Sequence, residues 1–139
     1  MPKLIFSTCS QLVSIDQISN NLSIYHIVEE LSSSQFPFQF PRIFVTSLWQ
    51  RYEDEKNVIF EVRIRFINPK NESKKEWKTE WQFERLRHRH ILSAVNLPFD
   101  IPGIYAFETC IRKKGERVWS KPVDQIPLPV KKSSKKKTS

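Results

Sequence analysis

The most regular stretch of the chain alternates between apolar and polar side chains with a period of two. In residues 58–68, five apolar side chains fall on one face and charged side chains fall between them. Successive side chains of a β-strand point to opposite faces, whereas a helix would spread these five residues around its circumference. The pattern therefore predicts a strand with one buried face. The apolar positions are Val58, Phe60, Val62, Ile64 and Phe66, and the charged positions are Glu61, Arg63 and Arg65.

The same kind of alternation recurs in further segments that are separated by turn residues. Residues 3–15 and 22–31 flank a polar turn and are expected to pair as a hairpin. In residues 76–86, aromatic side chains alternate with charged ones. The other expected strands are residues 42–53, 91–97 and 104–111 and the segment from Val118 onward. About eight strands at regular spacing predict an all-β fold, a single antiparallel β-sandwich with immunoglobulin-like or related Greek-key topology.

Prolines and glycines are expected to mark where strands stop. Pro37 and Pro41 predict an irregular, extended segment over residues 32–41. Gly103 and Gly115 predict turns on either side of residues 104–111, which would then form half of a closing hairpin. Pairing of the last strand is expected to end at the two late prolines, since proline lacks an N–H group. These prolines are Pro127 and Pro129.

Length and charge divide the chain into one domain and a short tail. A chain of 139 residues suits a single domain, which we place at residues 1–130. The formal net charge is +8, but residues 131–139 carry five lysines and leave 18 basic against 15 acidic side chains elsewhere. The tail is expected to be disordered, and either to aid solubility or to contact a polyanion. Its lysines are Lys131, Lys132, Lys135, Lys136 and Lys137.

The cysteines and the N-terminal segment predict a cytosolic protein. Cys9 and Cys110 lie in apolar runs without metal-ligand or redox spacing, so buried free thiols are expected. Polar residues interrupt the first 15 residues, which argues against a signal peptide. No apolar stretch approaches the length of a transmembrane helix.

Several segments together resemble a known family. They are LIFSTCSQLVSID, NNLSIYHIVEEL, FPRIFVTSLW, VIFEVRIRF and RHRHILSAVNLPFDIPGIYAFETCI, followed by the terminal hairpin. Over about residues 4–130 the chain resembles a family of small bacterial β-sandwich proteins of unknown function. The resemblance implies a compact sandwich and a bacterial cytosolic setting. It implies no activity, and the lysine tail lies outside it.

A basic run at residues 85–90 is the first candidate binding surface. Guanidinium groups pair well with phosphate and carboxylate groups, and we expect two further arginines of residues 58–68 on an adjacent strand. The alternative is a solvated strand face on which the arginines pair with Glu61, Glu80 and Glu84. The predicted anion or nucleic-acid surface comprises Arg63, Arg65, Arg85, Arg87, His88, Arg89, His90 and the five tail lysines.

The three histidines are weak candidates for a metal site. His88 and His90 are expected to share one face of a strand, and His26 is the only other histidine. Two ligands are too few for a zinc site, and neighbouring arginines would repel a cation. We therefore predict no bound metal.

A second candidate surface is the Phe–Pro segment of residues 32–41. Phe36, Phe38 and Phe40 alternate along it. Such rings either plug the end of a sandwich or form an exposed patch for a partner.

The residue patterns of common enzyme sites are missing. With only two glycines the chain has no phosphate-binding loop, and neither a G-x-S-x-G nor an H-E-x-x-H motif occurs. No cofactor is expected. We predict a non-enzymatic binding or assembly module with a protein partner. Binding of nucleic acid or another polyanion is the alternative, and a metal-dependent enzyme is a third class.

Overall fold

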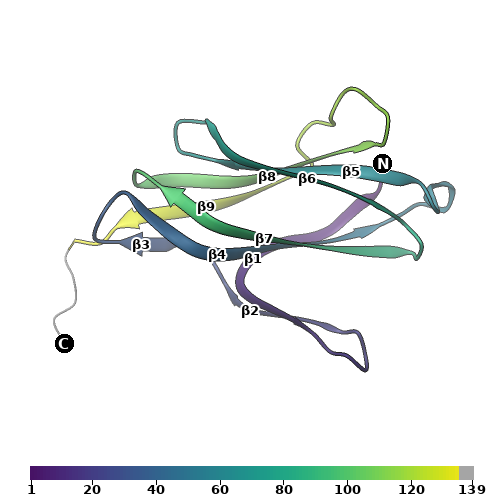
Figure 1. Ribbon diagram of the computed structural model, residues 1–139, viewed down its shortest axis with the longest axis horizontal. Helices are drawn as coiled ribbons and strands as arrows, with labels where there is room; N and C mark the ends of the chain where they lie inside the picture. The colour runs from purple at the N-terminus through teal and green to yellow at the C-terminus, as the bar shows by residue number, and fades with distance from the viewer. Residues whose placement is uncertain (135–139) are drawn as a thin grey trace.

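The protein folds into two β-sheets packed face to face, as the computed structural model describes for residues 1–134 (Figure 1). The four-stranded sheet has the order β2-β1-β4-β7, and the five-stranded sheet has the order β3-β9-β8-β5-β6. The strands are β1 Lys3–Ile15, β2 Leu22–Ile27, β3 Leu31–Ser33, β4 Phe38–Gln50, β5 Ile59–Ile67, β6 Ser73–Gln82, β7 Arg87–Phe99, β8 Gly103–Lys113 and β9 Asp124–Lys132. A 3-10 turn spans Glu53–Glu55, and residues 1–134 contain no α-helix. The all-β prediction is confirmed, whereas an immunoglobulin-like topology is not shown.

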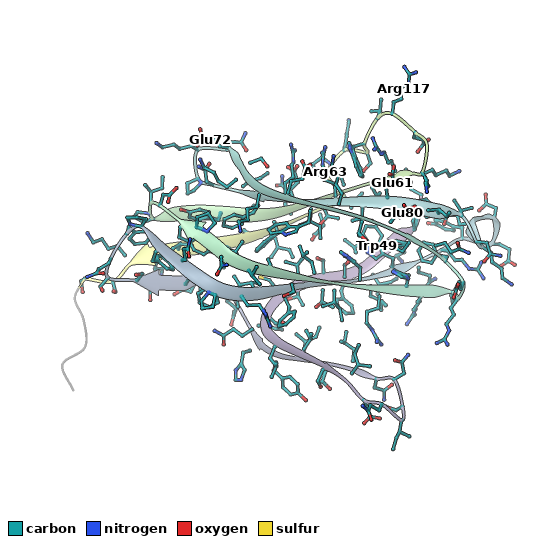
Figure 2. The ribbon with its side chains drawn as sticks, viewed as in Figure 1. Trp49, Glu61, Arg63, Glu72, Glu80 and Arg117 are labelled. Carbon is teal, nitrogen blue, oxygen red and sulfur yellow. The ribbon has the colours of Figure 1, made fainter. Side chains whose placement is uncertain are left out.

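The core lies between the two sheets and is rich in aromatic rings. Phe60, Val62, Ile64 and Phe66 of β5 are all buried, as the alternation predicts. Trp49 of β4 lies against Trp81 of β6 in the opposite sheet, with ring centroids 5.8 Å apart, and has no exposed surface (Figure 2). Fully burying a Val, Ile or Phe side chain stabilises a fold by about 1.5–3 kcal/mol. In residues 1–134, no helix is long and apolar enough to cross a membrane.

The two cysteines are buried free thiols, which confirms the prediction. Cys9 Sγ donates a hydrogen bond to the Val28 carbonyl at 3.4 Å. Burial raises the pKa of the Cys9 thiol to about 11, although a backbone hydrogen bond partly opposes it. Cys9 therefore stays protonated near neutral pH.

The structure has nine strands rather than about eight, because the strand expected over residues 22–31 ends at Ile27 and a separate strand, β3, begins at Leu31. β2 pairs antiparallel with β1, which confirms the predicted hairpin, but the backbone turns at His26 with a φ of +56°. The chain then crosses to the other sheet, where Leu31 of β3 lies opposite Val130 of β9 in a parallel pair. The sandwich is therefore not wholly antiparallel.

The expectation that prolines end the strands is wrong at three positions. Pro41 lies inside β4, at a point where β1 has not yet joined, since the β1–β4 ladder begins at Phe44. Pro127 and Pro129 lie inside β9 and opposite β8. They are two residues apart, so their missing N–H groups fall on one side and leave the ladder on the other side intact.

The start of the predicted tail also needs correction. β9 continues through Lys131 and Lys132, which pair with β3 beyond the expected boundary at residue 130. Lys135, Lys136 and Lys137 lie outside the described residues.

The outer half of the β1–β2 hairpin projects from the sandwich. β1 pairs with β4 only as far as Ser10, and beyond it residues 11–27 form a two-stranded ribbon that bends away from the five-stranded sheet (Figure 1). The Asn20 carbonyl near its tip accepts a hydrogen bond from Arg89 Nη2 at 2.9 Å. The four-stranded sheet is thus curled like a half-barrel with a concave outer face. Thr46 of β4 lies at the bottom of this concave face. It is fully buried although its side chain points away from the core.

The two glycines allow a matched test of the close approach between Gly103 and Pro69. Gly103 has a φ of +143°, and a Cβ there would lie 2.7 Å from Cγ of Pro69. Gly115 has a φ of +95° but open space around it. Alanine is strained at both positions, and the proline ring adds overpacking only at the first. In urea denaturation we expect Gly103→Ala to lower the free energy of unfolding by about 1 kcal/mol more than Gly115→Ala. Equal losses would contradict the close approach to Pro69.

Candidate functional site

The basic run predicted from the sequence forms the turn between β6 and β7 and the start of β7. Arg51 fixes this turn, because its backbone N–H donates to the Leu86 carbonyl at 3.0 Å and its Nε donates to the Arg85 carbonyl at 3.1 Å. From Arg87 onward, side chains alternate between the outer face of the sheet and the core. The basic run is therefore divided between two environments.

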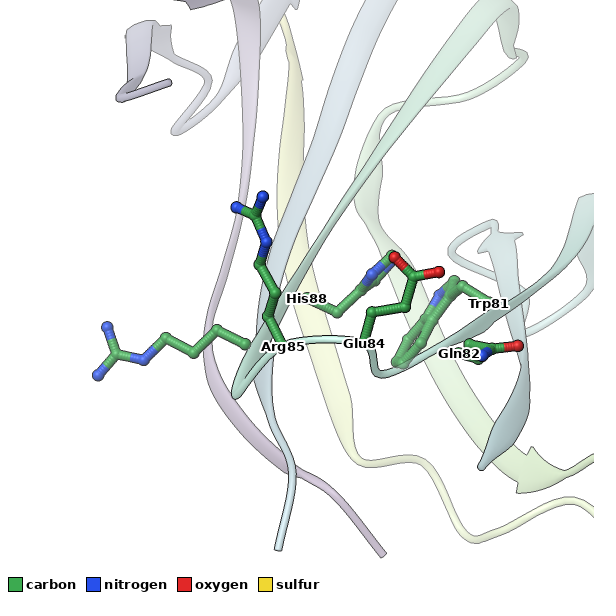
Figure 3. Close-up of a pocket in the computed structure, with 6 residues that line it drawn as sticks. Trp81, Gln82, Glu84, Arg85 and His88 are labelled. Carbon is green, nitrogen blue, oxygen red and sulfur yellow. The ribbon is translucent and has the colours of Figure 1, made fainter. Parts of the chain in front are cut away.

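His88 and His90 share one strand face, as predicted, but that face is turned toward the core. His88 lies opposite Trp49 in the β4–β7 ladder, and its ring stacks on Trp81 with centroids 4.2 Å apart. Figure 3 shows the two rings side by side, with the Glu84 carboxylate directed over His88. Burial lowers the pKa of His88, and the charge of Glu84 partly opposes this effect. His88 is therefore neutral near pH 7 and fills the inner side of a pocket.

This first pocket has a volume of about 440 Å³ and opens beside the β6–β7 turn. Its lining consists of Trp81, Gln82, Glu84, Arg85, Arg87 and His88 (Figure 3). Glu84 balances part of the positive charge here. The pocket accordingly offers a mixed, weakly charged surface.

His90 belongs to a row of polar side chains inside the sandwich. It lies opposite Ser47 of β4, and Ser47 lies opposite Ser7 of β1. Ser47 Oγ accepts a hydrogen bond from Trp49 Nε1 at 2.9 Å. Burial, with a smaller effect from the charge of His88, lowers the pKa of His90 to about 4. His90 is thus a half-buried neutral imidazole and carries no positive charge to a surface ligand.

The histidines do not converge on one point. His26 lies on β2 and the other two histidines lie on β7, and these strands are the opposite edges of the four-stranded sheet. Within residues 1–134, no group of three His, Cys, Asp or Glu side chains is placed to hold a metal ion.

Arg87 and Arg89 point outward and bond only to neutral acceptors in the described part of the chain. Arg87 Nε donates to Gln50 Oε1 at 3.1 Å, and Arg89 reaches the Asn20 carbonyl. Among residues 1–134, no carboxylate lies within 4.0 Å of the guanidinium of Arg85, Arg87 or Arg89. None of the three arginines therefore has a direct ion-pair partner in this part of the chain.

These three arginines surround an apolar floor. A second pocket, of about 490 Å³, is lined by Leu48 and Leu86 together with the arginines. Leu86 is 54% exposed, and Phe6 lies opposite Leu48 on the same face and is 38% exposed. We call this site the Arg–Leu pocket, defined by Leu48, Arg85, Leu86, Arg87 and Arg89.

Arg63 and Arg65 do not join this site, and the expectation of an adjacent strand is wrong. They lie on β5, whose neighbours are β6 and β8, whereas β7 belongs to the other sheet. Arg65 Nε donates to Glu108 Oε1 at 3.2 Å, and Arg63 lies over the Trp119 ring at 4.9 Å. Alternation identifies a face of a strand but not the neighbouring strand, which explains the error.

Ion pairs cross the outer face of the five-stranded sheet. Arg112 Nε lies 2.8 Å from Glu61 and Lys114 Nζ lies 3.0 Å from Glu80, so these two carboxylates pair with other cations and not with the basic run. Burial tends to raise the pKa of Glu108, but hydrogen bonds from Arg65 and Gln125 outweigh it and hold that pKa below its usual value. The charges of Arg65 and Arg112 are consequently neutralised by Glu108 and Glu61. No sequence pattern indicates Arg112, Glu108 or Trp119, because the first two have ion-pair partners more than 40 residues away and Trp119 lies on a loop.

The tail lysines within the described residues lie far from the Arg–Leu pocket. The end of β9 and the β6–β7 turn are at opposite ends of the sandwich (Figure 1). Lys131 Nζ also lies 3.3 Å from Glu30. The predicted polyanion surface is therefore dispersed over two sheets and two ends.

The three phenylalanines of the Phe–Pro segment are half-buried and pack against the core. Phe38 stacks on Phe99 with centroids 5.0 Å apart, and the edge of Phe36 meets Phe38 at 5.1 Å. Phe40 lies two residues further on the same strand. Their placement corresponds to a plug at the end of the sandwich, the first of the two arrangements expected from the sequence.

The chain belongs to a family of unknown function (DUF6941), whose model matches residues 4–130. The matched range includes the Arg–Leu pocket and the β1–β2 ribbon, and it ends within β9. A search of curated proteins gives no match.

Proposed function

We propose that this member of DUF6941 is a non-enzymatic binding module that takes an acidic, partly apolar segment of a protein partner into the Arg–Leu pocket. The observation that carries the proposal is the set of three arginines around exposed Leu86 that have no ion-pair partner among residues 1–134. Guanidinium forks pair bidentately with carboxylates, and an apolar floor buries the partner's apolar side chains. Both kinds of contact are available at one place.

The distribution of carboxylates supports an acidic partner. The four strands β1, β2, β4 and β7 contain no Asp or Glu, although they carry Lys3, Arg42, Arg87 and Arg89. In the other sheet, Arg65 and Arg112 already have carboxylate partners. Complementary potential steers association and suppresses partners of the wrong charge. An acidic segment is therefore favoured at the four-stranded sheet.

The apolar floor favours a protein partner over nucleic acid. Single-stranded nucleic acid usually binds through aromatic side chains on which bases stack, and duplexes bind through arrays of phosphate contacts. The floor here is formed by two leucines, and Lys131 lies at the other end of the molecule. Nucleic-acid binding remains the second function, supported by the three arginines alone.

A matched charge reversal tests the proposed function. The double variant Arg85→Glu/Arg87→Glu should retain at least about tenfold less partner than wild type, because attraction becomes repulsion at the pocket. Lys70→Glu/Lys121→Glu makes the same change in net charge at exposed positions outside the pocket and should retain the partner. The measurement is affinity purification from lysate of the source cells with quantitative mass spectrometry, followed by calorimetry with each purified candidate.

A nuclease arm separates the two classes of partner. Proteins that bind directly should be retained equally with and without nuclease. Loss of the retained material after nuclease treatment would assign the pocket to nucleic acid. Equal retention by all three proteins would exclude the Arg–Leu pocket as the binding site.

A further inference from the structure

Three of the four sheet edges in the described residues are protected against pairing with another strand. The edge strand β6 carries five charged side chains. Part of the β7 edge is covered by one of them, because Lys75 Nζ donates to the Val95 carbonyl of β7 at 3.0 Å. β3 has only three residues. Charged side chains, especially lysine, and very short strands are common means of preventing edge-to-edge association.

The fourth edge, β2, has none of these protections. Its sequence LSIYHI contains no charged residue and no proline, and its ladder with β1 has no bulge. One side of β2 bonds to β1, while its other side is the free edge of the four-stranded sheet. The unpaired N–H and C=O groups of such an edge are a template for another strand.

The ribbon that contains β2 is also poorly covered. Apart from the pair between Ser10 and Ile27, the strand residues of the ribbon pair only with one another, and a two-stranded ribbon on its own is at best marginally stable in water. Exposed apolar side chains occur on both of its faces. They are Leu12 at 50%, Tyr25 at 44% and Ile27 at 56% on the concave face, with Ile15 at 45% on the convex face. Added strands would stabilise the ribbon and cover part of this surface.

We propose that two copies of the chain pair antiparallel through their β2 edges and form a symmetric dimer. An antiparallel register centred on Ile24 sets this residue opposite its own copy and Ser23 opposite Tyr25. In this register, even-numbered residues lie opposite even-numbered residues and odd-numbered opposite odd-numbered. The concave faces of both ribbons therefore stay on the same side of the joined sheet. The two four-stranded sheets become one continuous sheet of eight strands.

The strand that pairs with β2 is assigned to a second copy of the chain because β2 carries no charged side chain. The chain has a net charge of +8, which opposes self-association over most of its surface, but β2 is uncharged and meets its copy without repulsion. The acidic segment proposed for the Arg–Leu pocket finds no basic side chain on β2. The dimer is thus independent of the proposed function, and either can fail alone.

Sedimentation equilibrium of the full chain between about 1 and 100 µM tests the dimer. Wild type should show twice the chain mass of 16.6 kDa. Ile24→Lys places like charges opposite each other at the two-fold axis and should weaken the dimer at least about tenfold. Val118→Lys, at an 80% exposed loop position, makes the same charge change and should remain dimeric.

A covalent readout covers the case in which Ile24→Lys disturbs folding. Residues directly opposite in an antiparallel pair have Cα atoms about 4.5–5.5 Å apart, which suits a disulfide. Under mild oxidation, Ile24→Cys should form a disulfide-linked dimer, whereas Val118→Cys should not. The native thiols are buried and do not interfere. A wild-type monomer at every concentration, or equal cross-linking of both cysteine variants, would overturn the proposal.

Discussion

Phe66→Ala should lower the free energy of unfolding by about 3–5 kcal/mol, the range for removing a large buried aromatic ring. The Phe66 ring has no exposed surface and lies between both sheets. Its centroid is 5.4 Å from that of Phe99 on β7, 5.4 Å from Tyr105 and 5.3 Å from Phe107. Removing it leaves a cavity that these rings, which also contact one another, cannot collapse to fill.

Urea denaturation followed by tryptophan fluorescence measures this loss. Phe66→Leu, which keeps most of the apolar volume, serves as the graded control and should cost less than half as much. Domains of this size have total stabilities of about 5–15 kcal/mol, so the alanine variant should be strongly destabilised or partly unfolded. A loss below about 1 kcal/mol would contradict a continuous aromatic core at this position.

Acidification from about pH 7 to pH 5 should lower stability by about 2 kcal/mol through His90 alone. Burial lowers the folded-state pKa of this imidazole to about 4, whereas the unfolded chain has the ordinary value near 6.5. Between these values the unfolded state binds a proton that the folded state does not. Stability is therefore fully present above the unfolded pKa and is lost as the pH falls toward 4.

The variant His90→Gln removes the titrating group and should have a flatter stability profile between pH 7 and pH 5. His88, whose pKa is also lowered by burial, remains in both proteins, so the difference between the two profiles isolates His90. Urea denaturation at several pH values provides the measurement. Parallel profiles for wild type and His90→Gln would show that His90 has the same pKa in the folded and unfolded states, and would contradict the effect of burial.

The strand faces were predictable from the sequence, but the strand neighbours were not. Residues 58–68 have one buried face, so their alternation identified every inward residue of β5. Alternation says nothing about which strand lies alongside, and Arg63 was therefore expected near the basic run although it lies in the other sheet. The parallel β3–β9 pair joins residues about 100 positions apart and leaves no local pattern.

The candidate site was predicted in part for the same reason. The run at residues 85–90 indicated a basic surface, and its spacing correctly put both histidines on one face. The direction of that face depended on pairing with Trp49 of β4. Residues 3–15 have no charged face, a pattern that is typical of a covered central strand. This holds only as far as Ser10, because beyond it β1 leaves β4 and its apolar residues become exposed.

The strands of the curled sheet contain no carboxylate, so their positive charges cannot be neutralised within that sheet. In the other layer, acidic and basic side chains alternate in the same strands, as Glu76, Lys78 and Glu80 do in β6. An acidic segment that approaches the concave side therefore meets attraction without repulsion from a strand carboxylate. This local attraction accelerates encounters at low ionic strength, and screening by salt reduces that advantage.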